Sequence, residues 1–475
     1  MISKKIVACW LLLIAAKSYA QDKSEYTLSV QAKISNQGSG KPPAFSDWKD
    51  YPTRTLATLS GYKPQKDIKL SSYGGRLDQK TTATGFFHVS KVNGRWWSVD
   101  PEGYLFIHKG VNDIRSGESE QNEKVFQEKF NSSGGWAQQT NVLLHELGFN
   151  GAGAWSDYKL LNKASVNQKP LAYTVILDFM GTYGRSRGAY QQSGHLGYPD
   201  NTIFVFDPGF EKFCNEYAKQ ITVNAQDKNL FGYFSDNELP FYRKTLDNFL
   251  SKKDTTDAGY LAAENWLKEQ HITQSAITDA DRNRFLGLVA DRYFAIVSKA
   301  IRKYDPNHMY IGCRFSAYEK NVKEVLQAGG KYLDIISINY YNQWTPQNGQ
   351  MENWTKWSGK PFLISEWYVK AEDSGMGNYA GAGWVVQTQQ DRGLFYQNYA
   401  LGLLESANCV GWHWFKYQDN DPANKNVDPS NTDANKGMLN TNYELYKGLT
   451  EQMKILNDQV YSLIDFFDQR KNKPD

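Results

Sequence analysis

The sequence predicts an α/β protein built on a (β/α)8 TIM barrel, with a small N-terminal β-rich extension. Two observations support this fold class. From about residue 105 onward, eight short β-prone runs alternate with helical stretches. Most of these runs are apolar almost throughout, as expected for strands buried on both faces. Residues 105–475 also fit the length range of a barrel with insertions. A doubly wound open sheet is the structural alternative.

The first twenty residues have the features of an export signal. Lys4 and Lys5 precede a mostly apolar stretch over residues 6–16, and Ser18-Tyr19-Ala20 supplies a small-x-small cleavage site. The apolar stretch is shorter than the about 20 residues of a membrane-spanning helix. We therefore expect export, to the periplasm or the medium, and no membrane span once the signal is removed.

Residues 21–104 are expected to form the N-terminal extension. The segments 85–89 and 95–99 are rich in aromatic and β-branched residues, and Asn93-Gly94 lies between them. Asn-Gly favours a tight hairpin turn. The hairpin either plugs the bottom of the barrel or belongs to a small β-domain packed on its side.

The barrel itself is expected over residues 105–475. The predicted strands are 105–112, 149–155, 174–180, 231–238, 309–315, 334–341, 361–367 and 410–417. Apolar residues at helical spacing predict helices at 281–303 and 385–406, and one last helix over 445–467. An extra helix at 261–271 and a polar connection at 420–440 follow the fourth and eighth strands. Because active sites are built on loops after barrel strands, both segments are candidate walls of a cleft.

Charge and cysteine content exclude several classes of function. Three of the 54 basic residues and none of the 51 acidic residues lie in the first twenty positions, so the remaining chain is formally neutral. This balance gives no support to a nucleic-acid partner. Cys214, Cys313 and Cys409 match no metal or redox spacing. We expect no cofactor and no metal.

Two of the predicted strands end on a carboxylate. Residues 232–238 read Gly-Tyr-Phe-Ser-Asp-Asn-Glu, and residues 361–367 read Pro-Phe-Leu-Ile-Ser-Glu-Trp. Glu238 and Glu366 would then lie on the fourth and seventh strands, nearly opposite each other across the barrel mouth. Retaining glycoside hydrolysis needs two such acids, one to protonate the leaving oxygen and one to attack the sugar carbon, whereas a wider spacing admits a water and inverts the centre. The alternative is that each acid is a solvated or salt-bridged strand end.

Polar residues beside these acids are candidates for substrate contacts. Asn237 can hydrogen-bond a sugar hydroxyl next to the scissile bond. Asn339 and Tyr340 end the sixth strand, where a tyrosine can donate to Glu366 and keep it ionised. Arg314 ends the fifth strand and can reach a hydroxyl or a carboxylate. The alternatives are core packing for Tyr340 and an ordinary buried ion pair for Arg314.

Three tryptophans are candidates for sugar stacking. Trp367 follows Glu366 and can form a wall of the site. Trp412 and Trp414 share one face of the eighth strand, because side chains alternate along a strand. They form either a floor under the sugar or part of the packed core.

Three longer segments resemble glycoside hydrolase family 50, the β-agarases, within the clan A retaining glycoside hydrolases. They are residues 96–103 leading into Gly110-Val111-Asn112, then residues 232–238, and residues 411–419. The resemblance covers about residues 85–470. It implies that Glu238 is the general acid/base, that Glu366 is the nucleophile, and that Asn112 and Asn237 contact the substrate. The substrate would be a β-linked neutral galactan such as agarose, cleaved with retention of configuration.

One feature departs from that family pattern. Many members carry a large N-terminal domain that resembles carbohydrate-binding modules, whereas only about 60–80 residues lie between the signal and the barrel here. Two other functions remain open. The chain could be a β-galactosidase or another β-glycan hydrolase of the same clan, or a non-catalytic glycan-binding barrel. In every case the expected partner is a polysaccharide or oligosaccharide.

Overall fold

The computed structural model describes residues 23–36, 44–65, 68–164 and 169–472. The predicted export signal, residues 1–20, lies outside the described residues. Within the described part of the chain, no helix is long and apolar enough to cross a membrane.

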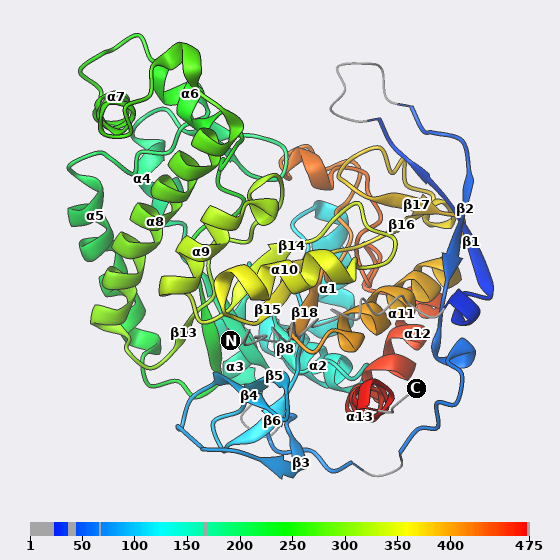
Figure 1. Ribbon diagram of the computed structural model, residues 1–475. Helices are drawn as coiled ribbons and strands as arrows, with labels where there is room; N and C mark the ends of the chain where they lie inside the picture. The colour runs from blue at the N-terminus through cyan, green and yellow to red at the C-terminus, as the bar shows by residue number, and fades with distance from the viewer. Residues whose placement is uncertain (1–22, 37–43, 66–67, 165–168, 473–475) are drawn as a thin grey trace, which may run out of the picture.

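An eight-stranded parallel sheet curls as in a TIM-like barrel at the centre of the molecule (Figure 1). Its strands in chain order are β7 (His108–Val111), β8 (Gly151–Ala152), β9 (Ala172–Ile176), β12 (Leu230–Phe234), β13 (Met309–Tyr310), β14 (Ile336–Asn339), β15 (Phe362–Glu366) and β18 (Cys409–Trp414). Hydrogen-bonded neighbours follow the order β13-β12-β9-β8-β7-β18-β15-β14. The two ends of this order meet through a parallel bridge between Phe315 and Ile338, where the Phe315 N–H donates to the Ser337 carbonyl at 3.0 Å. All eight predicted strands are therefore present in one sheet.

Helices surround the sheet on its outer side. They are α1 (Glu120–Phe130), α2 (Ser133–Glu146), α3 (Tyr158–Ala164), α4 (Phe179–Arg185), α5 (Phe210–Tyr217), α6 (Thr245–Leu250), α7 (Ala258–Glu269), α8 (Asp279–Tyr304), α9 (Lys323–Tyr332), α10 (Asn348–Ser358), α11 (Gln389–Glu405), α12 (Lys447–Asn457) and α13 (Val460–Asn472). The long helix α8 begins at a capping box made by Thr278 and Asp281 and ends before Asp305-Pro306, as its sequence predicts. The extra helix predicted after the fourth strand is α7, which forms a projecting lobe with α6 (Figure 1).

The sequence predicts one last helix over 445–467, but the structure has two. The chain turns between α12 and α13, at residues 458–459. This turn brings the Tyr461 hydroxyl within 2.7 Å of the Gly74 carbonyl, to which it donates. The contact with the N-terminal region therefore goes with a break in the helix, although the apolar spacing in the sequence continues through residues 458–459.

A four-stranded antiparallel sheet closes the bottom of the barrel. Its strands are β3 (Arg76–Lys80), β4 (His88–Val92), β5 (Arg95–Val99) and β6 (Tyr104–Phe106). Asn93 and Gly94 connect β4 to β5, both with positive φ, as the hairpin prediction requires. Phe87 and Phe106 are fully buried in a cluster with Phe231, Leu363 and Val410 from the barrel strands. The extension thus plugs the barrel, one of the two arrangements that the sequence left open.

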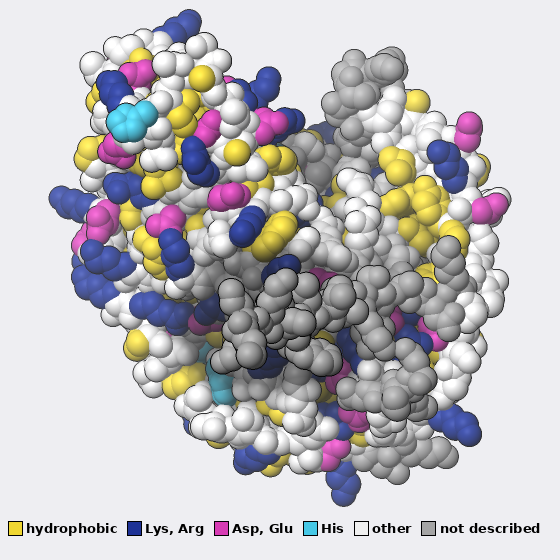
Figure 2. Space-filling view, in the orientation of Figure 1, with side chains coloured by type: hydrophobic (Ala, Val, Ile, Leu, Met, Phe, Trp, Pro, Cys, Tyr) yellow, Lys and Arg dark blue, Asp and Glu magenta, His cyan; other side chains and the backbone are white. Residues whose placement is uncertain are grey.

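The first part of the extension lies elsewhere. Strands β1 (Leu28–Ile34) and β2 (Lys49–Thr53) join β16 (Lys370–Ala371) and β17 (Trp384–Val386) in a separate four-stranded sheet. Strands β16 and β17 belong to the connection between β15 and α11, so the N-terminal arm packs beside the loop that follows Glu366. This sheet and the lobe of α6 and α7 lie on opposite sides of the molecule (Figure 1 and Figure 2).

Candidate active site

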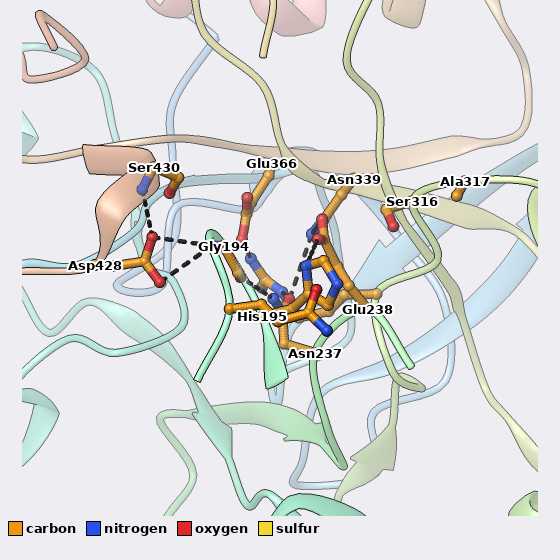
Figure 3. Close-up of polar contacts among 12 residues, drawn as sticks. Gly194, His195, Asn237, Glu238, Ser316, Ala317, Asn339, Glu366, Asp428 and Ser430 are labelled. Atoms are coloured by element: carbon orange, nitrogen blue, oxygen red, sulfur yellow. Dashed lines mark hydrogen bonds and ion pairs between the residues drawn. The ribbon is translucent and has the colours of Figure 1, made fainter. Parts of the chain in front are cut away.

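Glu238 and Glu366 come together at the C-terminal end of the barrel, with partners from several strands (Figure 3). Glu366 is the last residue of β15, and it is 6% exposed. Glu238 follows β12 by four residues and has a left-handed backbone, with φ at 51°. Asn339 at the end of β14 donates to Glu238 Oε1 at 2.7 Å. The two predicted acids therefore share one site with a residue of β14, the strand that pairs with β15.

Glu366 is held by two donors. The Arg314 guanidinium forms a buried ion pair with Glu366 Oε1 and also donates to the Ser365 carbonyl at 3.2 Å. The Tyr341 hydroxyl donates to Glu366 Oε2. A donor on each oxygen fixes the orientation of the carboxylate.

Glu238 keeps its proton to a higher pH than an ordinary carboxyl group does. Burial, followed by the nearby charge of Glu366, raises the pKa of Glu238 from 4.5 to about 8. The hydrogen bond from Asn339 and the charge of Arg314 act against that rise but do not cancel it. A carboxyl group that keeps its proton near neutral pH can serve as the acid in acid-assisted glycoside cleavage.

Asn237 and Arg314 connect the two acids. Asn237 Oδ1 accepts from Arg314 Nε at 2.9 Å, and Asn237 Nδ2 donates to the Gly194 carbonyl at 3.2 Å. Asn112 at the end of β7 is fully buried and donates to the Ser365 carbonyl at 2.7 Å. Asn112, Asn237, Arg314 and Asn339 are thus brought together around the acids, as the sequence predicts for their positions.

The four aromatic residues predicted to contact the substrate lie in the protein core instead. Each is at most 1% exposed and packs toward the helices: Trp367, Trp412, Trp414 and Tyr340. The Trp367 ring stacks on Tyr399 of α11 at 4.3 Å between ring centroids, and Trp412 donates to the Tyr396 hydroxyl at 3.0 Å.

Tyr340 donates to Gln350 of α10 at 2.6 Å, while the next residue, Tyr341, reaches Glu366. The expectation that Trp367, Trp412 and Trp414 line the sugar site and that Tyr340 orients Glu366 is therefore corrected. The structure supports the core-packing alternative, because the alternation of side chains sends the neighbouring residues inward instead.

His195 and Tyr341 are site residues that sequence reasoning missed. His195 lies in the turn between β10 (Tyr190–Gln191) and β11 (Leu196–Gly197), with Nδ1 at 3.7 Å from Glu238 Oε2. Burial lowers the pKa of His195, which favours its neutral form. The glycines within residues 181–197 indicate an irregular segment in the sequence. They do not indicate that His195 lies next to Glu238.

The β10–β11 hairpin is tied to the connection at 420–440. Asp428 accepts from the Gly194 N–H at 2.9 Å and from the Ser430 N–H at 2.7 Å (Figure 3). Beside this contact lies a polar hollow of about 250 Å³, lined among others by Asp113, Lys416 and Asp428. The predicted loop therefore does form a wall beside the acids. The described residues contain no group of three or more His, Cys, Asp or Glu arranged to hold a metal ion.

The backbone is left-handed near the end of each of the first six barrel strands. The residues concerned, with φ between 51° and 62°, are Asp113, Trp155, Asp178, Glu238, Arg314 and Asn342. Non-glycine residues adopt this conformation rarely, and such strain collects at functional sites. Because Glu238 and Arg314 are both in this set, the strained positions mark the mouth of the barrel as the site.

A curled parallel sheet with two carboxyl groups at its C-terminal mouth is an arrangement that glycoside hydrolases use. No family model matches the chain. A solved structure described as BpGH50 is 33% identical, covers 93% of this chain and 96% of that one, and superimposes with a TM-score of 0.82. The chain therefore belongs to glycoside hydrolase family 50.

Three further proteins have lower sequence identity to this chain. Beta-agarase B of Vibrio sp. (strain JT0107) is 25% identical over an alignment of 486 positions that covers 83% of this chain and 50% of that protein. Beta-agarase A of the same organism is 24% identical over an alignment of 493 positions that covers 82% of this chain and 48% of that protein. The chain thus spans about half the length of these two relatives. A structure described as an exo-beta-agarase, 22% identical over 86% of this chain and 69% of that one with a TM-score of 0.69, shares the fold.

Proposed function

We propose that the chain is a retaining glycoside hydrolase that cleaves β-galactosidic linkages in a neutral galactan, with agarose as the first substrate to test. The observation that carries this proposal is the placement of Glu238 and Glu366 at the barrel mouth, where Asn339 binds the first and Arg314 and Tyr341 bind the second. The names of the two Vibrio relatives, both beta-agarases, support the choice of agarose. We also propose that the protein is exported, and that an extension ends and the catalytic barrel begins at about residue 104. Membership of clan A stays a prediction.

The first step places the proton and the nucleophile on different residues. Glu238 donates its proton to the glycosidic oxygen as the bond to the leaving sugar breaks. The Glu366 carboxylate attacks the anomeric carbon and forms a glycosyl ester. Glu238, now ionised, then takes a proton from a water that hydrolyses the ester, which restores both residues and retains the configuration.

Arg314 and Tyr341 position the nucleophile in this scheme. Both donate to Glu366, so its two oxygens are fixed before the substrate arrives. Asn237 is held by Arg314 and is next to Glu238 in the chain, so its amide is available to a hydroxyl beside the scissile bond. A bond of that kind lowers the barrier only if it strengthens in the transition state.

Replacing the nucleophile tests the mechanism. We expect Glu366→Gln to abolish turnover and to leave glycan binding within a few-fold of the parent, since the amide keeps the shape of the carboxylate. Glu372→Gln, which changes a half-exposed carboxyl six residues further on, is the matched control and should turn over normally. Near-normal activity of Glu366→Gln would refute the assignment.

The stereochemistry and the substrate are tested separately. Proton NMR of the first products should show the β-anomer before mutarotation, whereas initial α-product would indicate inversion. A reducing-sugar screen against agarose, porphyran, carrageenan and β-glucans identifies the substrate. Cleavage of another glycan, but not agarose, would keep the mechanism and change the specificity. Binding without any product after long incubation would favour a non-catalytic barrel.

A further inference from the structure

We propose that Trp155 is the surface on which a sugar of the neutral galactan stacks in the catalytic centre. The inference rests on the proposed function and names a residue that determines how the substrate is held. Trp155 was not among the aromatic candidates, because it follows the second strand, far in sequence from both acids.

The environment of Trp155 places it beside the nucleophile. The Arg314 guanidinium lies between two aromatic rings, with its central carbon 4.7 Å from the centroid of Trp155 and 4.7 Å from that of Phe234. The same guanidinium pairs with Glu366. Trp155 and the nucleophile therefore contact the same guanidinium group.

Trp155 also differs from the other strand-end tryptophans in exposure. It is 38% exposed, whereas Trp367, Trp412 and Trp414 are at most 1% exposed. Its contact with Phe415 is edge-on, at 6.2 Å between ring centroids, so the ring is held by its neighbours without being covered. An ordered and accessible indole next to a reacting centre is what a stacking platform requires.

The backbone supports a functional role. Trp155 has φ at 61°, a conformation that is rare for a bulky residue and that it shares with Glu238 and Arg314. Glycine at this position would adopt the same backbone conformation without the strain. The strain at Trp155 therefore points to a role for its side chain, by reasoning from an observed outlier to a function.

The chemistry of a galactoside fits this surface. In galactose the axial hydroxyl at carbon 4 leaves one ring face with a continuous patch of C–H groups, and such a patch packs on an indole without breaking hydrogen bonds. The stacking excludes water above Arg314 and Glu366 at the same time. A neutral sugar suits the position, because the cation under the indole is already paired with Glu366.

The test measures binding and turnover separately. In a Glu366→Gln background, we would titrate oligosaccharides of whichever screened glycan the wild type cleaves and follow tryptophan fluorescence and calorimetric Kd. Trp155→Ala is expected to weaken binding at least tenfold, and Trp155→Phe to stay within about threefold of the parent. The fluorescence change on binding should be lost in Trp155→Phe. Trp357→Ala, which removes a partly buried tryptophan from the outer helix α10, is the control and should bind like the parent.

Several outcomes would overturn the proposal. A Kd of Trp155→Ala within twofold of the parent, with only kcat reduced in the active background, would show that Trp155 merely covers Arg314. If Trp155→Ala fails to fold, an unchanged fluorescence response in Trp155→Phe would contradict it equally. Cleavage of a glycan other than agarose would refute agarose as the substrate but would leave the role of Trp155 open to the same test. The Kd values of the Trp155 variants are compared on whichever glycan is cleaved. No binding and no cleavage of any glycan would refute both.

Discussion

The proton held by Glu238 should make folding stability depend on pH in a specific way. In the folded protein, burial and the charge of Glu366 raise the pKa of Glu238 from 4.5 to about 8. A carboxyl group whose pKa is raised by folding contributes stability that is fully present below pH 4.5 and is lost as the pH rises through about 8. At 1.36 kcal/mol per pH unit, the loss over this window is on the order of 5 kcal/mol. The Glu238 side chain is only 15% exposed, so solvent screens little of this cost.

Glu238→Gln removes this titration and leaves the shape of the side chain unchanged. We would measure the free energy of unfolding in urea for the wild type and for Glu238→Gln at half-unit steps from pH 4.5 to 9. Subtracting the two curves cancels other buried groups that titrate in the same range. The variant should gain stability relative to the wild type by on the order of 5 kcal/mol across the window.

Two results would refute this reasoning. A difference curve that stays flat between pH 5 and 9 would mean that Glu238 is ionised in the folded protein throughout. A curve of the opposite sign would mean that folding favours its charged form. In a Glu366→Gln background the change should be smaller but not zero, because burial remains when the neighbouring charge is removed.

Two further predictions concern activity and stability at opposite ends of the barrel. Asn339→Leu removes a hydrogen bond that favours the charged form of Glu238, so the basic limb of the kcat/KM profile should move up by ~1 pH unit. The control is Asn398→Leu, which changes a buried residue of helix α11 and should leave that limb in place. A downward move of the limb in Asn339→Leu would contradict the assignment. Phe106→Ala empties a fully buried position in the bottom plug and should lower the free energy of unfolding by about 3–5 kcal/mol. Because Phe106 lies away from the mouth, kcat per folded molecule should stay unchanged, and a selective loss of kcat would argue against a purely structural plug.

The sequence was sufficient for the strands and the acids, but not for the direction of their side chains. The barrel runs are detectable because most are apolar and helical stretches separate them. The same continuous apolarity removes the alternation that would show which residues face inward. This is why Trp412 and Trp414 were considered for the sugar site, although His413 between them is the residue that points into the barrel, at 2.9 Å from His108.

Contacts between distant loops are the second part that the sequence does not reveal. Asp428 binds the turn at Gly194 across 234 positions, and β1 pairs with β17 across more than 350. Neither contact leaves a periodic pattern, because each depends on a few polar or backbone groups. The N-terminal arm beside the loop after Glu366 could therefore not be separated in advance from the plug under the barrel.

The left-handed strand ends explain why Glu238 could be located in the sequence but the direction of its side chain could not. Alternation along a strand predicts side-chain direction only while the backbone stays extended. Glu238 lies four residues beyond β12, and its φ of 51° turns its side chain toward Asn339. Each such turn costs about 1–2 kcal/mol for a residue with a Cβ, and six of them ring one mouth. A packed and plugged barrel can sustain that cost, so the stability of the lower half is what permits the strained geometry of the site above it.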